Sequence, residues 1–482
     1  MNFNFKRVAD PVYRTIGLSK LEVEVVNTSV FQRLRNIKQL GLAHFVFPGA
    51  DYSRFSHSLG VCHVTGRILE ALKTSNASGF PKVKDIALYR LAGLLHDIGH
   101  YPFSHAMENA IEKFYRDKLI VSVGTSSNHQ KNDYHDNDTD KFQFFNHEKT
   151  GGHILANDAE LSKVLQDGNI NPDDVSAIFM RSRPQPLANL VSSDLDADRI
   201  DYLLRTAHHS GLPYGSVDLD YIISQMCLDN DGKVCLTIKA LRAADHMLLC
   251  RYFDYLQSTY HKTVRGIELV LEDVIMGLLD SGMISCSRHD VTRMIIDGSW
   301  EAFDESCLFE KIRRLNNDTG DSEIIAKTNS ILKRWPPKLV WEDEFLASRH
   351  EPKTKELFSH LVQRAKENMS QWSEQCGISQ RRWYVWSKNV ALTKVGSLVE
   401  VSSRFESKSD EEDNYWQAVR ILAGDKSGAS RPIMKEDRSL MKVLSNYSIY
   451  ILRVYVLLQP EEVDRLESIK YTVSKTLSSP KS

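Results

Sequence analysis

The chain has little cysteine: seven residues are scattered through 482 positions, and none forms a C-x-x-C pair. An odd number of widely spaced cysteines argues against both a disulfide framework and a cysteine zinc site. The first residues also lack the apolar core of a secretory signal. A cytoplasmic location in a reducing environment therefore fits the sequence best.

Long apolar runs and a charge imbalance are also missing. No segment approaches the ~20 consecutive apolar residues that a membrane helix needs, so we expect no membrane partner. The 61 basic and 63 acidic side chains nearly cancel, so there is no global field that would attract the chain to polyanions. Any nucleic-acid binding is expected to be weak and to depend on local clusters.

The hydrophobic pattern predicts a mainly α protein. From about residue 19 to residue 280, apolar residues recur at helical spacing, including a stretch from Leu241 to Leu279. The exception is residues 226–237, where two short apolar segments flank an Asp-Gly turn and predict a β-hairpin. A chain of this length also exceeds the roughly 250 to 300 residues of one core.

Later segments look different. Strand-like patterns occur at 396–402 and, more clearly, at 448–457, and a last helix follows Pro460. We predict a helical catalytic core over residues 1–285, with a polar insertion at about 120–142. A smaller α+β region over residues 286–482 is expected to serve regulation or oligomerisation.

The most informative motif is His96-Asp97, at the end of a predicted buried helix. A buried imidazole and carboxylate are costly unless they are paired or bind a metal. His57 and Asp198, each on an otherwise apolar segment, are two further candidate ligands. Such a mixed nitrogen and oxygen set suits a divalent transition metal, with iron, manganese and zinc left open.

Other polar residues near this motif predict hydrolysis of a phosphate compound. His100, His105 and Glu108 follow closely enough to line one cleft, and His147 adds an imidazole after the insertion. Such groups can activate a nucleophile and protonate a leaving oxygen. Candidates for holding phosphate oxygens are Arg54, Arg199, Tyr202 and Arg251.

Together these motifs resemble a known family. Asp10-Pro11-Val12-Tyr13, the segments 31–41, 46–50 and 54–60, the histidine motif 96–105, Asn146-His147-Glu148, the segment 196–211 and Tyr260-His261-Lys262 occur in its order. The chain resembles the HD-domain deoxynucleoside triphosphate triphosphohydrolases, in particular the branch of the human SAM-and-HD-domain enzyme without the SAM domain. The resemblance covers roughly residues 5 to 280.

The resemblance implies a helical HD core that hydrolyses dNTPs to deoxynucleoside and tripolyphosphate, as an oligomer (dimer or tetramer). Magnesium is expected to accompany the nucleotide. The implied metal ligands are His57, His96, Asp97 and Asp198, and the implied catalytic set is His100, His105, Glu108 and His147. The resemblance assigns Arg54, Arg199, Tyr202 and Arg251 to the triphosphate, Gln39 to the sugar, and Asn27, Gln32 and Arg35 to an activator nucleotide.

The chain departs from its relatives at several of these positions. Arg199 replaces a lysine, Thr206 replaces an acidic residue that helps to read the sugar, and Asn27 replaces the aspartate that reads guanine. Glu108 stands where the family often has aspartate. With these changes the sequence still predicts the same class of reaction, but it does not predict which sugar the substrate has or which base the activator nucleotide has.

Two alternatives therefore remain beside the dNTP hypothesis. The first is an HD hydrolase that acts on another nucleotide or on a nucleic-acid end. The second is a nucleotide-sensing or single-strand-binding protein, in which the basic residues Arg33, Arg35 and Lys38 would contact phosphate.

Overall fold

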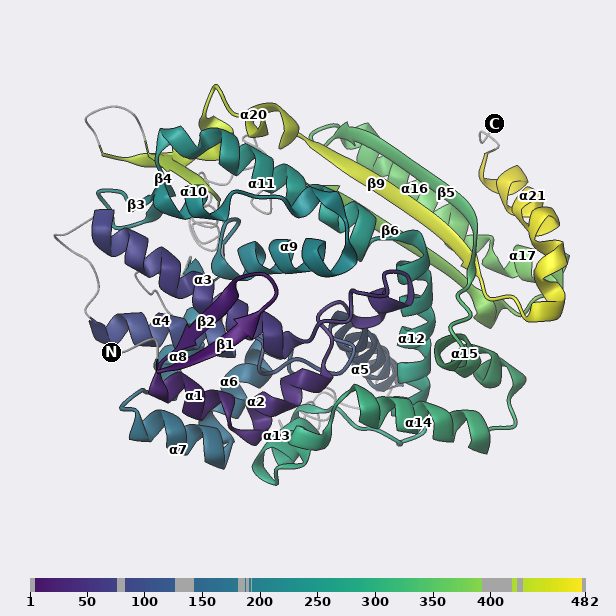
Figure 1. The fold of residues 1–482 in the computed structure, drawn as a ribbon. Helices are drawn as coiled ribbons and strands as arrows, with labels where there is room; N and C mark the ends of the chain where they lie inside the picture. The colour runs from purple at the N-terminus through teal and green to yellow at the C-terminus, as the bar shows by residue number, and fades with distance from the viewer. Residues whose placement is uncertain are drawn as a thin grey trace.

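The computed structural model describes residues 5–75, 83–125, 143–180, 187, 190–191, 193–391, 418–422 and 428–478. Helices dominate these ranges, and the strands form small sheets (Figure 1). The predicted fold class, mainly α with a smaller α+β part, is confirmed. In the described ranges, no helix has both the length and the apolarity needed to cross a membrane.

The first half of the chain is built around α3 (Arg54–Ser75). This helix packs against α4 (Val83–Leu95) and α9 (Ala197–Ser210), while α5 (His105–Thr125) packs against α12 (Lys262–Asp280). The remaining helices of this half are α1 (Lys20–Val26), α2 (Ser29–Gln32), α6 (His147–Asn157), α7 (Ala159–Asp167), α8 (Pro172–Met180), α10 (Leu219–Ser224) and α11 (Leu241–Asp254). These packings bring α3, α9 and the end of α4 together.

Local sequence signals define α9. Asp196 caps its first turn by accepting a hydrogen bond from the backbone N–H of Arg199 at 2.7 Å. Gly211 ends the helix in the left-handed conformation, with φ 72°, which a glycine adopts without steric cost. Ile200 and Leu203 are buried in the core, so the polar residues of α9 lie on its other faces.

The helical stretch predicted from residue 241 to 279 is interrupted. After α11, residues Tyr255–Thr259 form a π-helical turn, and α12 begins only at Lys262. Such turns displace side chains from the regular helical positions and often occur at functional sites. The apolar spacing of the sequence carries no signal for this interruption.

The second half combines helices with a three-stranded antiparallel sheet in the order β5-β9-β6. Its strands are β5 (Lys338–Ser348), β6 (Trp383–Ala391) and β9 (Tyr447–Val456). Its helices are α13 (Arg288–Ile296), α14 (Glu305–Asp318), α15 (Ser322–Leu332), α16 (Pro352–Glu367), α17 (Met369–Cys376), α20 (Met441–Leu444) and α21 (Leu466–Leu477). The strand predicted at 448–457 and the last helix are confirmed, and the strand predicted at 396–402 falls outside the described residues.

Two hairpins complete the fold. β1 (Lys6–Asp10) and β2 (Arg14–Leu18) form an N-terminal hairpin that the sequence pattern did not predict. The predicted hairpin is confirmed as β3 (Met226–Leu228) and β4 (Val234–Leu236). Gly232 in its turn has φ 76°.

The β3-β4 hairpin also connects the two predicted regions. β4 pairs in parallel with β7 (Arg420–Leu422), which pairs with β8 (Ser430–Pro432). The boundary predicted at residue 285 therefore stays a prediction, since this sheet contains strands from both sides of it. Helix α5 continues to Thr125, and residues 126–142 of the predicted polar insertion lie outside the described part.

Candidate metal centre and active-site cavity

His96 and Asp97 directly follow the last residue of α4, where the chain enters an irregular turn. Gly99 in this turn allows close packing against the start of α6, because a Cβ there would lie 2.2 Å from the backbone oxygen of His147. Phe103 and Ser104 have φ of 56° and 55°, which is unusual for non-glycine residues. This tight turn brings His100 and the start of α5 next to α6.

The four predicted metal ligands lie together. His57 Nε2 is 3.0 Å from Asp198 Oδ1 and 3.8 Å from Asp97 Oδ2. His96 Nε2 is 3.3 Å from Asp97 Oδ1 and 3.7 Å from Asp198 Oδ1. The ligand atoms of His57, His96 and Asp97 all lie within 4.8 Å of one another, a spacing that could hold one ion.

The hydrogen bonds of the two imidazoles fit a metal. His57 donates from Nδ1 to Asp201 at 2.7 Å, and His96 donates from Nδ1 to the backbone oxygen of Gly93 at 2.9 Å. Each imidazole thus keeps Nε2 for a ligand bond, as metal-bound histidines do. Within the described part of the chain, the buried Nε2 of His96 has no hydrogen-bond partner, which is costly unless a cation binds there.

Burial and neighbouring charges shift the pKa values of this cluster in opposite directions. Burial alone would lower the pKa of His57, but the carboxylates of Asp198 and Asp201 outweigh burial and raise that pKa to about 9. Burial would raise the pKa of Asp198, yet the hydrogen bond from His57 and the nearby imidazole of His96 hold it below its usual range. The carboxylates of Asp97, Asp198 and Asp201 thus favour positive charge on this cluster, and a divalent cation can supply it.

The side chain of Arg54 is bound to Asp97, although Arg54 also lines the cavity described below. Its Nη1 donates to Asp97 Oδ2, and its Nε donates to Ser104 Oγ at 2.9 Å. Burial would raise the pKa of Asp97, but Arg54 and the histidines hold it well below its usual range. Arg54, predicted to bind the triphosphate, thus also keeps Asp97 ionised and oriented.

A second group of titratable residues lies beside the first. His147 Nδ1 is 3.1 Å from both carboxylate oxygens of Glu108, and His105 Nδ1 is 3.2 Å from Glu108 Oε2. Burial would raise the pKa of Glu108, but these hydrogen bonds hold it well below its usual range. His100 stacks on His147 with ring centroids 4.0 Å apart, and it connects the two groups because its Nε2 lies 3.2 Å from Asp97.

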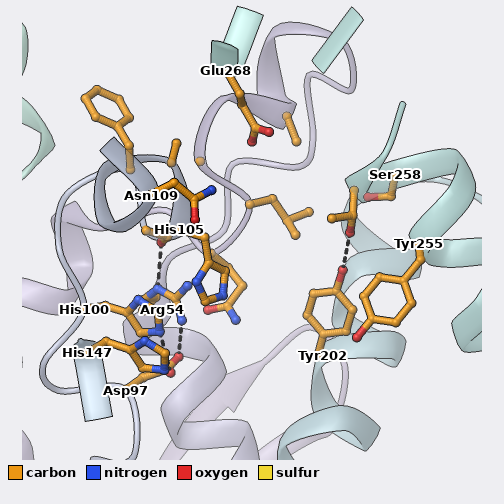
Figure 2. A pocket seen from close by; sticks show the side chains of 18 of the residues that line it. Arg54, Asp97, His100, His105, Asn109, His147, Tyr202, Tyr255, Ser258 and Glu268 are labelled. Atoms are coloured by element: carbon orange, nitrogen blue, oxygen red, sulfur yellow. Dashed lines mark hydrogen bonds and ion pairs between the residues drawn. The ribbon is translucent and has the colours of Figure 1, made fainter. Parts of the chain in front are cut away.

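These two groups face one cavity of about 530 Å³. Figure 2 shows the histidines and Asp97 on one side of it and Tyr202, Tyr255 and Ser258 on the other. The predicted site residues that line it are Gln39, Arg54, His96, Asp97, His100, His105, His147, Asp198, Arg199 and Tyr202. Most of the residues predicted for chemistry and substrate binding are therefore brought together.

Some predicted residues lie elsewhere. Arg251 is buried outside the lining and donates to Asp194. Thr206 is also buried outside it and shares a 2.7 Å hydrogen bond with the hydroxyl of Tyr52, so it does not reach a sugar in this conformation. The fully buried His57 stands behind the cavity wall.

The predicted activator residues also lie away from the cavity lining. Gln32 Nε2 donates to the backbone oxygen of Val26, and Arg35 Nε donates to Gln32 Oε1 at 2.7 Å. Asn27 follows the end of α1 and is exposed. These three residues are close in sequence and at the surface, and an activator site there stays a prediction.

The three basic residues considered for nucleic-acid contact, Arg33, Arg35 and Lys38, do not form one exposed cluster, because only Arg35 is exposed. Arg33 is buried, donates to the backbone oxygens of Phe303 and His100, and lies over the Trp300 ring. Burial lowers its pKa to about 9. Lys38 pairs with Glu305 at 3.4 Å. The structure gives no support to a phosphate contact by Arg33, because its guanidinium is buried and bonds to two backbone segments.

Comparison with known proteins identifies the segment that carries the site. The HD domain family matches residues 54–206. Residues 54–206 are an HD domain. All four predicted metal ligands and the second histidine group fall inside this HD domain, whereas Tyr255, Ser258 and other lining residues come from later in the chain.

Several known proteins are similar to the chain. The uncharacterised protein YwfO of Bacillus subtilis is 30% identical over 269 residues, 55% of this chain and 54% of its own length. The deoxynucleoside triphosphate triphosphohydrolase SAMHD1 of Bos taurus is 28% identical over 377 residues, 74% of this chain and 61% of its own length. The crystal structure of a hypothetical protein from Aquifex aeolicus has a TM-score of 0.67 at 23% identity, covering 97% of this chain and 99% of that one, and shares the fold.

The first curated relatives extend well beyond the matched region, which spans about half of their length.

Sequence reasoning missed several of these cavity residues. Tyr255, Ser258 and Thr259 reach the cavity through the π-helical turn, and Trp386 and Lys388 reach it from β6. Only their positions in space connect them with the HD domain, so no local motif could have identified them. Asp201 was different, since a second carboxylate three residues after Asp198 on the same helix was a visible signal for a group supporting His57.

Proposed function

We propose that the protein is a metal-dependent phosphohydrolase that converts dNTPs to deoxynucleoside and tripolyphosphate. One observation carries the proposal: His96, Asp97 and Asp198 of the candidate metal cluster line the same cavity as His105 and His147 of the second group. The likeness to a deoxynucleoside triphosphate triphosphohydrolase supports the substrate class.

In the proposed reaction, water attacks the α-phosphorus and the bond between this phosphorus and the 5′ oxygen breaks. The 5′ oxygen takes up a proton, and the oxygen of water leaves with the tripolyphosphate. His57, His96, Asp97 and Asp198 would hold a divalent cation, which supplies Lewis-acid polarisation of the phosphoryl oxygen and the water. Magnesium accompanying the triphosphate would add charge neutralisation.

Proton movement is assigned to the second histidine group. The Glu108 carboxylate accepts from Nδ1 of His105 and His147, which leaves Nε2 of each ring to take or give a proton. The His105 side chain is 68% exposed, so it can exchange that proton with solvent. We therefore assign protonation of the leaving 5′ oxygen to His105, and orientation of the reacting groups to His147 and His100.

The opposite side of the cavity is suited to a nucleotide. Arg199 lines it with a guanidinium whose Nη1 is 3.6 Å from Asp196 and 3.8 Å from Asp194, distances at which it can turn toward a phosphate. Gln39 has a buried side-chain oxygen without a hydrogen-bond partner in the described ranges, and a sugar hydroxyl would satisfy it. Tyr202 donates or accepts a 3.0 Å hydrogen bond with Thr259.

The test is release of tripolyphosphate from each dNTP by the purified protein with Mn²⁺ or Mg²⁺, with and without GTP or a second dNTP. His96→Ala should abolish release, whereas the control His153→Ala should not, because His153 lies on α6 outside the cavity lining. A wild type that releases no tripolyphosphate under any combination contradicts the proposal. If the protein cleaved rNTPs or oligonucleotides and not dNTPs, the alternative substrates would be supported.

A further inference from the structure

The N-terminal hairpin contains a motif, Asp10-Pro11-Val12-Tyr13, to which the proposed reaction gives no role. Asp10 ends β1 and is buried. Its Oδ1 accepts hydrogen bonds from the backbone N–H groups of Val12 and Tyr13, both at 2.9 Å. These bonds fix the turn and hold the second oxygen, Oδ2, toward the interior of the protein.

Asp10 Oδ2 accepts a 2.8 Å hydrogen bond from Nη1 of Arg205 on α9. Arg205 is fully buried and uses its other side to bind Asp201, one turn earlier on the same helix. Its Nε donates to Asp201 Oδ2 and its Nη2 donates to Asp201 Oδ1, both at 2.9 Å. Such a two-point contact fixes the plane of the carboxylate as well as its position.

Asp201 Oδ2 also accepts the 2.7 Å hydrogen bond from Nδ1 of His57. The side chains of Asp201 and His57 are both completely buried. An unbroken series of hydrogen bonds therefore runs from Asp10 in the N-terminal hairpin, through Arg205 and Asp201, to a candidate metal ligand on α3.

The side chains of this series are tightly packed between α3 and α9. Gly60 lies one turn after His57 on α3, and a Cβ there would stand 1.8 Å from Asp201 Oδ1 and 2.5 Å from Arg205 Nη2. Only a glycine lets α3 approach α9 closely enough for the contact between Asp201 and His57. Burying these charges has a desolvation cost that well-packed apolar residues would avoid, which suggests that they serve a purpose besides stability.

We propose that Asp10, Arg205 and Asp201 are positioning residues that increase the affinity of the candidate metal centre for a divalent metal. Asp201 keeps the Nδ1 proton of His57 in place and thereby directs Nε2 at the ion. Arg205, held in turn by Asp10, fixes the carboxylate of Asp201 in the required orientation. This inference rests on the metal centre of the proposed function, and it gives the N-terminal hairpin a role in that centre.

The experiment measures the dissociation constant of Mn²⁺ for metal-stripped protein by calorimetry. Loss of a carboxylate that supports a ligating histidine typically weakens metal binding by roughly 10- to 100-fold. We expect a loss in this range for Asp201→Asn and a smaller loss, about 3- to 10-fold, for Asp10→Asn. Arg205→Lys should lie between them, because lysine keeps the charge but not the two-point contact.

The matched control is Glu22→Gln, which breaks another buried carboxylate–arginine contact. Arg90 binds Glu22 through Nε at 2.6 Å and Nη2 at 3.0 Å, both residues are buried, and this contact includes no candidate metal ligand. This variant should lower the melting temperature of the metal-stripped protein and leave its Mn²⁺ affinity within about 2-fold of wild type.

Unchanged Mn²⁺ affinity in folded Asp10→Asn and Asp201→Asn would overturn the proposal, as would an equal loss in Glu22→Gln. If Asp201→Asn does not fold, Asp10→Asn and Arg205→Lys decide the question. The measurement does not depend on turnover. A wild type that binds Mn²⁺ but hydrolyses no dNTP would contradict the proposed substrate and leave the positioning role standing.

Discussion

The two sides of the active-site cavity differ in their polar groups, which are ionisable imidazoles and a carboxylate on one side and hydroxyls on the other (Figure 2). On the histidine side, Asp97 contacts Arg54, His57, His96 and His100. On the tyrosine side, formed by α9 and the π-helical turn, the hydroxyls of Tyr202 and Thr259 bond to each other. The buried Ser258 Oγ has no hydrogen-bond partner in the described residues.

This difference matches two separate tasks. A reacting phosphorus is stabilised best by charges that are oriented before the substrate arrives, because reorientation during the reaction costs free energy. A binding wall instead needs polar groups that still have hydrogen bonds to make with a ligand. The histidine side fits the first task and the tyrosine side fits the second.

The largest expected effect is that of Asp97→Asn, which tests the task assigned to the histidine side. The change removes a negative charge from the candidate metal site and leaves Arg54 without its buried anion. We expect loss of bound metal and at least a 10³-fold fall in phosphohydrolase activity, about 4 kcal/mol. Metal analysis and steady-state kinetics check this.

A control for Asp97→Asn is Asp245→Asn. Asp245 is a buried carboxylate that bonds to Ser439 and the backbone of Leu440, away from the cavity. It should keep metal and activity. If the Asp97 variant retained full metal content, the four-residue cluster would not be the metal site.

Glu108→Gln should have the next largest effect. The amide cannot hold His105 and His147 as the carboxylate does, so we expect kcat to fall roughly 10²- to 10³-fold, in line with loss of general acid–base catalysis. Metal content should stay at the wild-type level, because Glu108 belongs to the other group. A parallel loss of metal in this variant would show that the two groups act as one site.

The smallest expected effect concerns stability on the tyrosine side. Asp254 precedes the π-helical turn, and its burial raises its pKa from 3.8 to about 7, with little compensation from the nearby Tyr202 hydroxyl. The folded protein thus holds this proton more tightly than the unfolded chain does. The resulting stabilisation is complete below about pH 4 and is lost as pH rises through 7.

Asp254→Asn removes that pH dependence. Relative to wild type, the variant should gain about 2 to 3 kcal/mol of stability between pH 5 and pH 8, because part of the linkage already lies below pH 5. Melting temperatures at the two pH values measure the gain, and Asp245→Asn is again the control. If the variant and the wild type differed in melting temperature by the same amount at pH 5 and at pH 8, Asp254 would be ionised in the folded protein over this whole range.

Much of the histidine side could be predicted from local sequence. The apolar stripe before His96 indicates a buried helix that ends at the His96-Asp97 pair, and α4 ends at Leu95. Glu108 follows His105 by three residues, and the two side chains bond to each other on α5. These contacts depend on spacing within one helix, which the sequence displays directly.

The tyrosine side could not be predicted in this way. Ser258 and Tyr255 reach the cavity through a π-helical turn within a stretch whose apolar spacing reads as one helix. Arg251 and Thr206 show the reverse case, since both stand at positions that the resemblance links to function yet lie buried outside the cavity lining. Burial and side-chain direction depend on neighbours that are distant in sequence, so residue identity alone does not report them.

The sequence by itself determined which chemical groups are present and which of them share a helix, and this was enough to indicate metal-assisted hydrolysis of a phosphate compound. Only the tertiary structure decided which groups meet. His57 and Asp198 are 141 residues apart but come within 3.0 Å, because α3 and α9 pack closely. Metal binding and hydrogen bonding act over a few ångströms, so they depend on helix packing that local periodicity does not specify.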